Sequence, residues 1–452
     1  MRLFFDQSGR LDERWISQRM IRWLLWALAP VLVASIVTGI FLRHNDFRWH
    51  YAQGEKMLTG RTPGDGQNSG IPAPYLMGRM MFDAALALLP YRFARAAVWT
   101  AALVALVHSL SNWGRLLNVE ASRRRAVAAL AVWWALPFLY RDMDDCGLQV
   151  LTLALFTLGA AALINRRPLA AGGWMALAAS YKTTPLLVLP YLLYKRLWRE
   201  AAVMAAALGL INGALPMAFF GWKQTLQANE AFAALAMAST SDDPSANGLD
   251  APTQQNLSLK LALVRYLQTF PPDHSLFLAA PGQKNSDQQL LKPVSQIRRH
   301  WAFFQFFDFR PATVNLVIAA ALMSMGIGLA WAFRESGRMI PDARLARELA
   351  VVAVVFTVLS PMCWQQHLVM MLPLVMVVLW DAFCKPMKRW HRAVLLGVWC
   401  CFWLPQREVF GRDLTVVISS YKLPTIACIA LIFLALRRSR PPSLTEPSRS
   451  QS

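Results

Sequence analysis

The sequence predicts an all-α protein that crosses a membrane many times. Of its 452 residues, 56% are hydrophobic and only 16% are charged, and the mean hydropathy is +0.34. Apolar stretches of about 20 residues, the length that a spanning helix needs, recur along the chain and are separated by short clusters of Arg and Lys. A chain of this size with so many hydrophobic and so few charged residues would not stay soluble in water. We therefore place the protein in a bilayer.

The net charge of +20 follows from this topology. The excess of Lys and Arg lies mostly between the apolar segments and in the tails. Basic residues at these positions keep the ends of spanning helices that they flank on the cytoplasmic side. The charge therefore does not indicate a nucleic-acid partner. The six cysteines lie in or beside apolar segments without the paired spacing of a metal site, so we interpret them as small hydrophobic residues. No cofactor and no bound metal is expected.

The first spanning helix is predicted at 23–42. This run is too long for the core of a signal peptide, so it should remain as the first span. Residues 43–74 follow as an outward loop. The apolar segment 75–90 contains Arg79 and Asp83, whose charges are costly inside a bilayer and favour a helix lying in the interface.

The segment 169–194 is predicted to break inside the membrane. Basic residues flank it on both sides, so both of its ends should be cytoplasmic, and Pro185 interrupts helical hydrogen bonding. We therefore expect a re-entrant or short helical pair that breaks at Lys182–Pro185. The other spans are predicted at 93–112, 126–140, 147–164, 201–220, 311–333, 349–360, 366–383, 393–404 and 424–436.

These segments form one transmembrane domain of residues 23–436 with about ten spans. Residues 1–22 precede it as a cytoplasmic N-terminus. The longest outward loop is predicted at 221–310, where turn signals such as SDDPSANG occur. The tail 437–452, rich in Ser, Pro and Arg, is expected to be disordered in the cytoplasm.

Five polar residues are candidates for chemistry at the outer membrane surface. Asp46 opens the first outward loop, where a carboxylate could act as a base toward a lipid headgroup. Lys182 lies in the predicted break, where an ammonium usually has an anionic partner such as a phosphate. His367, Gln149 and Asn256 add hydrogen-bonding capacity on the same side. Their grouping away from the cytoplasm indicates a site.

Each residue by itself also fits a structural role. Asp46 could pair with Arg at the interface, Lys182 could snorkel from a helix end, and His367 could be a packing residue. A metal site of His44, Asp46 and His50 is disfavoured, because the two histidines lack a regular ligand spacing. No Walker A loop or dinucleotide fingerprint occurs, and nucleotide donors are scarce outside the cytoplasm. A transferase at this surface would therefore use a group activated on a lipid.

Four stretches between residues 45 and 373 form an ordered set of motifs. They begin with NDFRWHYAQGEKMLTG, continue through a central block from GLQVLTL to SYKTTP and through TQQNLSLKLALVRYL, and end with LSPMCWQQHLVMMLP. In order and spacing they resemble glycosyltransferase family 87, polytopic enzymes of the GT-C fold that include polyprenyl-phosphate-mannose-dependent mannosyltransferases. The chain departs from the family pattern at three places. A Leu separates the usual Gly-Gln pair, giving GLQ; Asn-Leu-Ser stands in place of Asn-Gln-Ser; and Lys-Thr-Thr-Pro is one residue longer than the common form.

The resemblance implies that an acceptor hydroxyl outside the cytoplasm attacks a sugar carried on a polyprenyl phosphate. Asp46 would be the base of a single inverting displacement. Lys182, or His367 if protonated, would meet the charge on the departing phosphate, while Gln149, Asn256 and His367 could position the sugar or acceptor. The expected partners are a polyprenyl-phosphate donor of mannose or a similar sugar and a lipid or glycan acceptor. The expected location is a bacterial plasma membrane.

Two alternatives remain open from the sequence. A transporter or flippase of a lipid-linked saccharide would also use intramembrane charges and broken helices, although its charges should centre near the midplane. An O-antigen ligase or polymerase, which uses a diphosphate-linked glycan, would match arginines of the long loop such as Arg265, Arg298 and Arg299.

Overall fold

The computed structural model describes residues 5–12, 14, 17–42, 46–59, 75–238, 256–269 and 301–438. Within these ranges the chain is helical apart from turns and short connections, and a single bridge between Phe5 and Leu11 is the only β-type pairing. The predicted all-α class is therefore confirmed. Parts of the predicted loops 43–74 and 221–310, and the tail from 439, lie outside the described residues.

The described residues contain five helices long and apolar enough to cross a membrane, or six spans if a bent pair counts as one. The predictions of about ten spans and of a GT-C fold remain predictions. The five are α1 (Gln18–Ile36), α4 (Tyr91–Leu116), the continuous run Trp198–Phe220 with α9 (Trp198–Gly209) and α10 (Leu215–Phe220), α14 (Pro311–Ala332), and Gln365–Cys384 with the 3₁₀ turn η6 (Gln365–Met371) and α16 (Leu372–Cys384).

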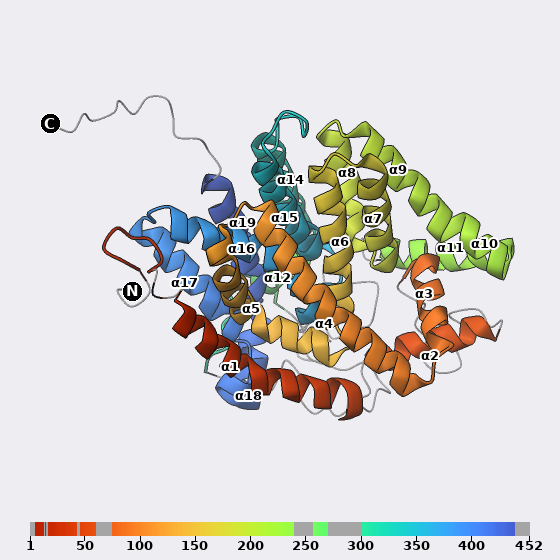
Figure 1. Ribbon diagram of the computed structural model, residues 1–452, viewed down its shortest axis with the longest axis horizontal. Helices are drawn as coiled ribbons and strands as arrows, with labels where there is room; N and C mark the ends of the chain where they lie inside the picture. The colour runs from red at the N-terminus through yellow and green to blue at the C-terminus, as the bar shows by residue number, and fades with distance from the viewer. Residues whose placement is uncertain are drawn as a thin grey trace.

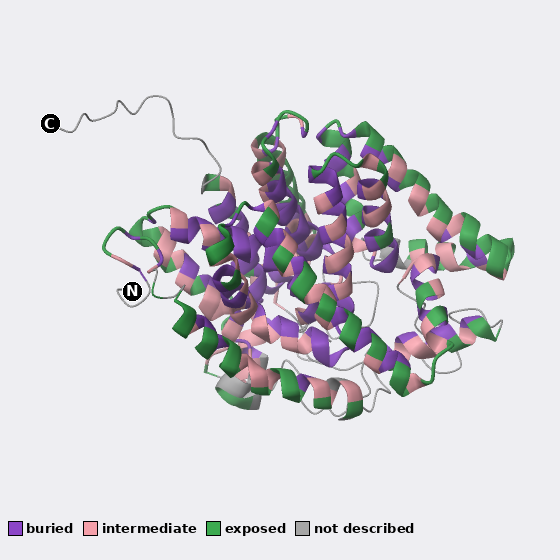
Figure 2. Ribbon diagram, in the orientation of Figure 1, coloured by how far each residue is buried: buried purple, intermediate pink, exposed green. Residues whose placement is uncertain are grey.

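Apolar side chains fill the centre of the molecule and also lie exposed on helices at its margins. In Figure 1, α16 lies within the bundle while α1 and α10 run along its edges. Buried residues concentrate in the middle, and α1 is largely exposed (Figure 2). Trp23 and Trp26 of α1 are 63% and 72% exposed. Exposed rings on a helix of this length indicate a surface that faces lipid rather than water.

The bent pair is formed by α5 (Ala121–Asp144) and α6 (Leu148–Ile164), which meet at 114°. The turn between them uses Gly147 in the left-handed region at φ 72°, where a Cβ would lie 2.3 Å from the side chain of Ala102. Glycine is therefore required at this turn. The next helix, α7 (Pro168–Tyr181), ends at the predicted break, since Lys182 is extended and η3 (Thr184–Leu187) leads into α8 (Val188–Tyr194).

Helices also occur where the sequence indicated loops. The first predicted outward loop contains α2 (Asp46–Leu58), and the long loop contains α11 (Trp222–Ala238) and α12 (Leu259–Leu267). A further helix, α18 (Arg407–Ser420), lies between the last two predicted spans. The remaining helices are α3 (Met77–Ala87), α15 (Asp342–Leu359), α17 (Arg389–Trp403) and α19 (Leu423–Arg438).

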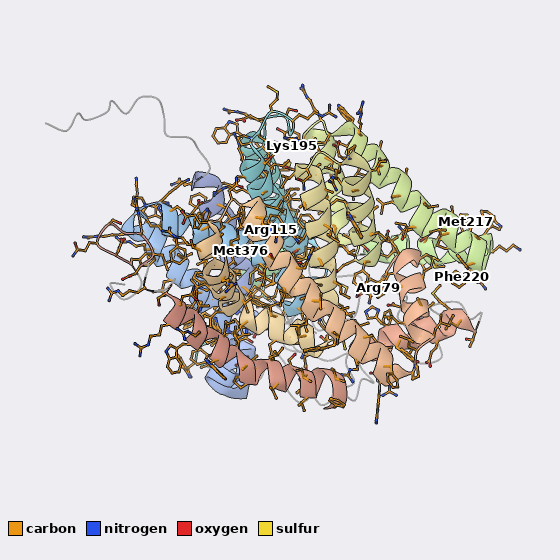
Figure 3. The ribbon with its side chains drawn as sticks, viewed as in Figure 1. Arg79, Arg115, Lys195, Met217, Phe220 and Met376 are labelled. Atoms are coloured by element: carbon orange, nitrogen blue, oxygen red, sulfur yellow. The ribbon has the colours of Figure 1, made fainter. Side chains whose placement is uncertain are left out.

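One buried ion pair joins α8 to α15. The Lys195 ammonium lies 2.8 Å from a carboxylate oxygen of Glu348 and donates to the Phe333 carbonyl at 2.9 Å, and the Tyr191 hydroxyl donates to Glu348 at 3.1 Å. Lys195 is fully buried, so its charge is compensated inside the protein. Figure 3 shows Lys195 at one edge of the bundle, well away from Arg79 on α3. We assign this pair a structural role.

Candidate functional site

An apolar cluster brings together three of the residues predicted to form the site. Phe47, Leu148 and Tyr181 all belong to it, and each is the chain neighbour of a candidate: Asp46, Gln149 and Lys182, respectively. The start of α2, the start of α6 and the end of α7 therefore border the same apolar cluster. The other buried members of the cluster are Ala94, Val98 and Cys146.

Lys182 is joined to a fourth predicted residue, His367, from the opposite side. The Lys182 Nζ lies 2.5 Å from His367 Nε2, and both side chains are buried. Because an ammonium can only donate, Nε2 accepts from a charged Lys182, and Nδ1 lies 3.1 Å from both the Met362 carbonyl and the Trp364 backbone nitrogen, which hold the ring in place. A second positive charge at this distance would be strongly repelled, so the geometry favours a neutral His367 that orients a charged Lys182.

Asn256, the fifth predicted residue, holds the loop that leads to His367. Its amide nitrogen donates to the Pro361 carbonyl at 2.7 Å, and its amide oxygen accepts from the backbone N–H groups of Ser258 and Cys363, both at 3.0 Å. The backbone N–H of Leu257 donates to the Cys363 carbonyl. Since the Asn256 amide bonds to both sides of this loop, we interpret this residue as one that positions His367.

Acidic residues at the turn between α5 and α6 orient Gln149. The buried carboxylate of Asp142 accepts from the backbone N–H groups of Gln149 at 3.0 Å and Val150 at 2.9 Å, which caps the start of α6. Asp145 accepts from Gln366 Nε2 at 3.5 Å and so connects this turn to η6. The Gln149 side-chain oxygen is buried without a hydrogen-bond partner. It is an acceptor that a sugar or acceptor hydroxyl could satisfy.

Asp46 is the first residue of α2; its side chain lies outside the described part of the structure. One helical turn later, on the same face, His50 Nδ1 lies 2.9 Å from a carboxylate oxygen of Asp83 on α3. The other Asp83 oxygen accepts from Arg79 Nε at 2.9 Å, and the Arg79 guanidinium lies 4.0 Å from the centre of the Tyr181 ring. A continuous series of buried contacts therefore runs from the helix that carries Asp46 to the neighbour of Lys182.

Helices α2 and α3 touch at Gly54. A Cβ at this position would lie 2.1 Å from the backbone oxygen of Asp83, far inside contact distance. Because that obstacle is main chain, no rotamer change could make room for a side chain. Gly54 therefore sets the separation of α2 from α3, and with it the distance of Asp46 from Lys182.

Replacing Gly54 by Ala is expected to lower both the thermal unfolding midpoint and the activity. Overpacking at a backbone contact costs about 1–3 kcal/mol, and the displaced α2 carries Asp46 away from the site. Gly173→Ala is the matched control, because a Cβ there has no heavy atom within 4 Å. A helical Gly-to-Ala change in open space is neutral or stabilising by about 0.5–1 kcal/mol. Equal midpoints and activities for the two variants, measured in nanodiscs, would contradict this role of Gly54.

The sequence also contained a signal for this group of charges. Arg79 and Asp83 are spaced i,i+4 in an apolar helix, and ionisable residues at such positions usually face one another or a functional site. Their charges predict that the helix lies in the interface, and in the structure Asp83 binds both Arg79 and His50. In the described part of the chain, no three His, Cys, Asp or Glu side chains are grouped so as to hold a metal ion.

Comparison with known proteins finds one family model that matches part of the chain. The sequence model of glycosyltransferase family 87 matches residues 80–281. Gln149, Lys182 and Asn256 lie inside the matched stretch, while Asp46 and His367 lie outside it. No curated protein and no solved structure matched the chain.

Proposed function

Because the chain belongs to glycosyltransferase family 87 and is a membrane glycosyltransferase, we propose that it moves mannose or a similar sugar from a polyprenyl phosphate to an acceptor hydroxyl. The acceptor is a lipid or glycan on the extracytoplasmic side of the membrane. The cell membrane of a bacterium is the expected setting. The observation that carries the proposal is the buried Lys182–His367 pair at a helix break, next to the cluster that holds the start of α2.

The proposed reaction is a single displacement. Asp46 takes the proton of the acceptor hydroxyl as its oxygen attacks the anomeric carbon from the face opposite the phosphate. The bond between the anomeric carbon and the phosphate oxygen breaks, its electron pair stays on the phosphate, and the configuration inverts. The products are the glycosylated acceptor, polyprenyl phosphate and one proton on Asp46, which solvent removes before the next turnover.

Lys182 meets the charge that develops on the leaving phosphate. A phosphate leaves without being protonated, so a cation is more useful there than a general acid. Burial strengthens the interaction, because the surrounding dielectric constant is lower than that of water. The unsatisfied oxygen of Gln149 is placed to accept a hydroxyl hydrogen bond and so to fix the orientation of the sugar or acceptor.

A transfer assay tests this function. Full-length protein in proteoliposomes is supplied with extracted acceptor lipids and with radiolabelled sugar either on a polyprenyl phosphate or on a nucleoside diphosphate. We expect label to enter the acceptor from the polyprenyl donor and not from the nucleotide. Transfer from the nucleotide donor alone would overturn the proposal. Movement of the donor between leaflets without a new glycosidic bond would favour the flippase instead.

A further inference from the structure

Arg265 on α12 is a buried cation outside the group of residues described above. It is only 1% exposed. Its Nη2 donates to the Phe304 carbonyl at 3.0 Å, its Nε lies 3.4 Å from the Ser420 hydroxyl, and its guanidinium carbon lies 4.5 Å and 4.9 Å from the ring centres of Phe303 and Tyr421. Its Nη1 is buried without a hydrogen-bond partner.

No carboxylate compensates the charge of Arg265 in the described part of the chain. Lys195 and Arg79, also buried, lie against Glu348 and Asp83. The rings beside Arg265 attract it by cation–π contact, but this attraction is weaker than the cost of desolvating a single ion. The guanidinium is therefore set up for an anion that would complete its hydrogen bonding at Nη1.

The segment that carries Arg265 also carries Asn256 and borders the proposed reaction site. The Thr425 hydroxyl of α19 donates to the Leu257 carbonyl at 2.7 Å, which joins this segment to the turn between α18 and α19. Lys422 lies fully buried in that turn, where burial and the nearby Arg265 lower the pKa of its ammonium to about 7. The Leu257 N–H donates to the carbonyl of Cys363, which lies four residues before His367. Arg265 is thus connected to the reaction site through buried groups.

An exposed aromatic ridge lies beside Arg265, which donates to the backbone carbonyl of Phe304 in that ridge. The ridge consists of Trp301, Phe304, Phe306, Phe307 and Phe309, which are between 39% and 80% exposed. Its backbone is fixed, because the Phe304 N–H donates to the Tyr421 hydroxyl at 2.6 Å and the Phe309 N–H donates to the Leu267 carbonyl at 2.9 Å. A fixed segment rich in exposed rings marks a surface for lipid or another apolar partner.

We propose that Arg265 binds the phosphate of an isoprenoid lipid whose hydrocarbon chain lies against the aromatic ridge. A phosphate oxygen can accept the charge-assisted hydrogen bond that Nη1 leaves open. The long apolar chain attached to that phosphate matches the exposed rings of the ridge. One amphiphile therefore satisfies both features. The choice of this lipid rests on the proposed function, in which a polyprenyl phosphate is the donor's carrier and also a product.

Binding of undecaprenyl phosphate to full-length protein in nanodiscs tests the proposal. We expect Arg265→Gln to weaken binding about tenfold or more, because a charge-assisted hydrogen bond contributes about 1.5–3 kcal/mol. Inorganic phosphate, which lacks the chain, and undecaprenol, which lacks the phosphate, should both bind much more weakly to the wild type. Arg166→Gln is the control, because it removes the same charge from a half-exposed pair with Asp342. Equal affinity of Arg265→Gln and wild type for undecaprenyl phosphate would overturn the proposal.

A second measurement does not depend on the folding of the Arg265 variant. A photoactivatable analogue of undecaprenyl phosphate should label peptides from residues 301–309 in the wild-type protein. Labelling should fall on replacement of both Phe304 and Phe307 by Ser, since these side chains are exposed and their loss leaves the core intact. Labelling confined to other parts of the chain would overturn the proposal.

The two proposals can fail separately. If the wild type transfers sugar and Arg265→Gln binds the carrier normally, the anion site at Arg265 is wrong and the proposed function stands. If no polyprenyl donor supports transfer but Arg265→Gln still weakens undecaprenyl phosphate binding, the lipid site stands and the proposed function is wrong.

Discussion

Replacing Asp46 by Asn is expected to abolish sugar transfer while the protein still folds and inserts into the membrane. The amide keeps the size and shape of the carboxyl group but cannot take the proton of the attacking hydroxyl. General base catalysis contributes about 10²–10⁴-fold to a rate, and turnover should fall by that factor. Because Asp46 is the first residue of α2 and Asn has nearly the same shape, the substitution changes only the end of the helix.

The decisive measurement compares turnover with donor binding. Asp46→Asn should lower kcat and leave the affinity for the polyprenyl-phosphate donor nearly unchanged, because the base acts on the acceptor. Asp342→Asn, which alters an exposed carboxylate paired with Arg166, should behave like the wild type. If Asp46→Asn retains normal turnover, another group must remove the proton and the proposed mechanism is wrong.

Replacing Lys182 by Met is expected to reduce kcat about 10²–10³-fold, the usual loss when one preorganised group stabilising transition-state charge is removed. Met keeps the length of the side chain and its apolar contacts near Tyr181, so the bundle should remain folded. Donor affinity should fall as well, because the donor phosphate is already charged in the ground state. Lys388→Met removes the same charge from an exposed position and should have no effect.

A double-mutant cycle separates the role of His367 from that of Lys182. If His367 acts by holding the ammonium 2.5 Å from its Nε2, His367→Gln should cost activity in the wild-type background and almost none when Lys182 is already Met. Additive losses would instead give His367 a direct part in binding or catalysis.

The sequence predicted the break at Lys182–Pro185, the helix α14 and the run through α9 and α10, because each depends on local signals. Flanking basic clusters, a proline and about 20 apolar residues are sufficient for such features. The helical nature of α2 was not evident, because its composition is polar and its buried face has only a few apolar residues. Phe47, His50, Gly54 and Met57 share that face, but recognising it requires knowing that α3 lies against it.

The long-range contacts of the candidate site could not be predicted for a different reason. Asn256 was predicted as a hydrogen-bonding residue of the outer surface, yet its partners Pro361 and Cys363 lie more than 100 residues away. Composition and spacing do not encode such a pairing. Likewise, Arg265 appeared in the sequence only as one arginine of a long loop. Its burial between Phe303 and Tyr421 becomes visible only in three dimensions.

The single charge shared by Lys182 and His367 bears on how a cycle of turnover would end. A sugar phosphodiester carries one negative charge, which this pair balances. The phosphate monoester left behind carries about 1.5–2 negative charges at neutral pH, so the same pair no longer provides electroneutrality. Attraction to the buried ammonium grows with that charge, so the spent carrier is held more strongly than the donor was. We therefore expect departure of the carrier, and not formation of the glycosidic bond, to limit the rate of repeated turnover.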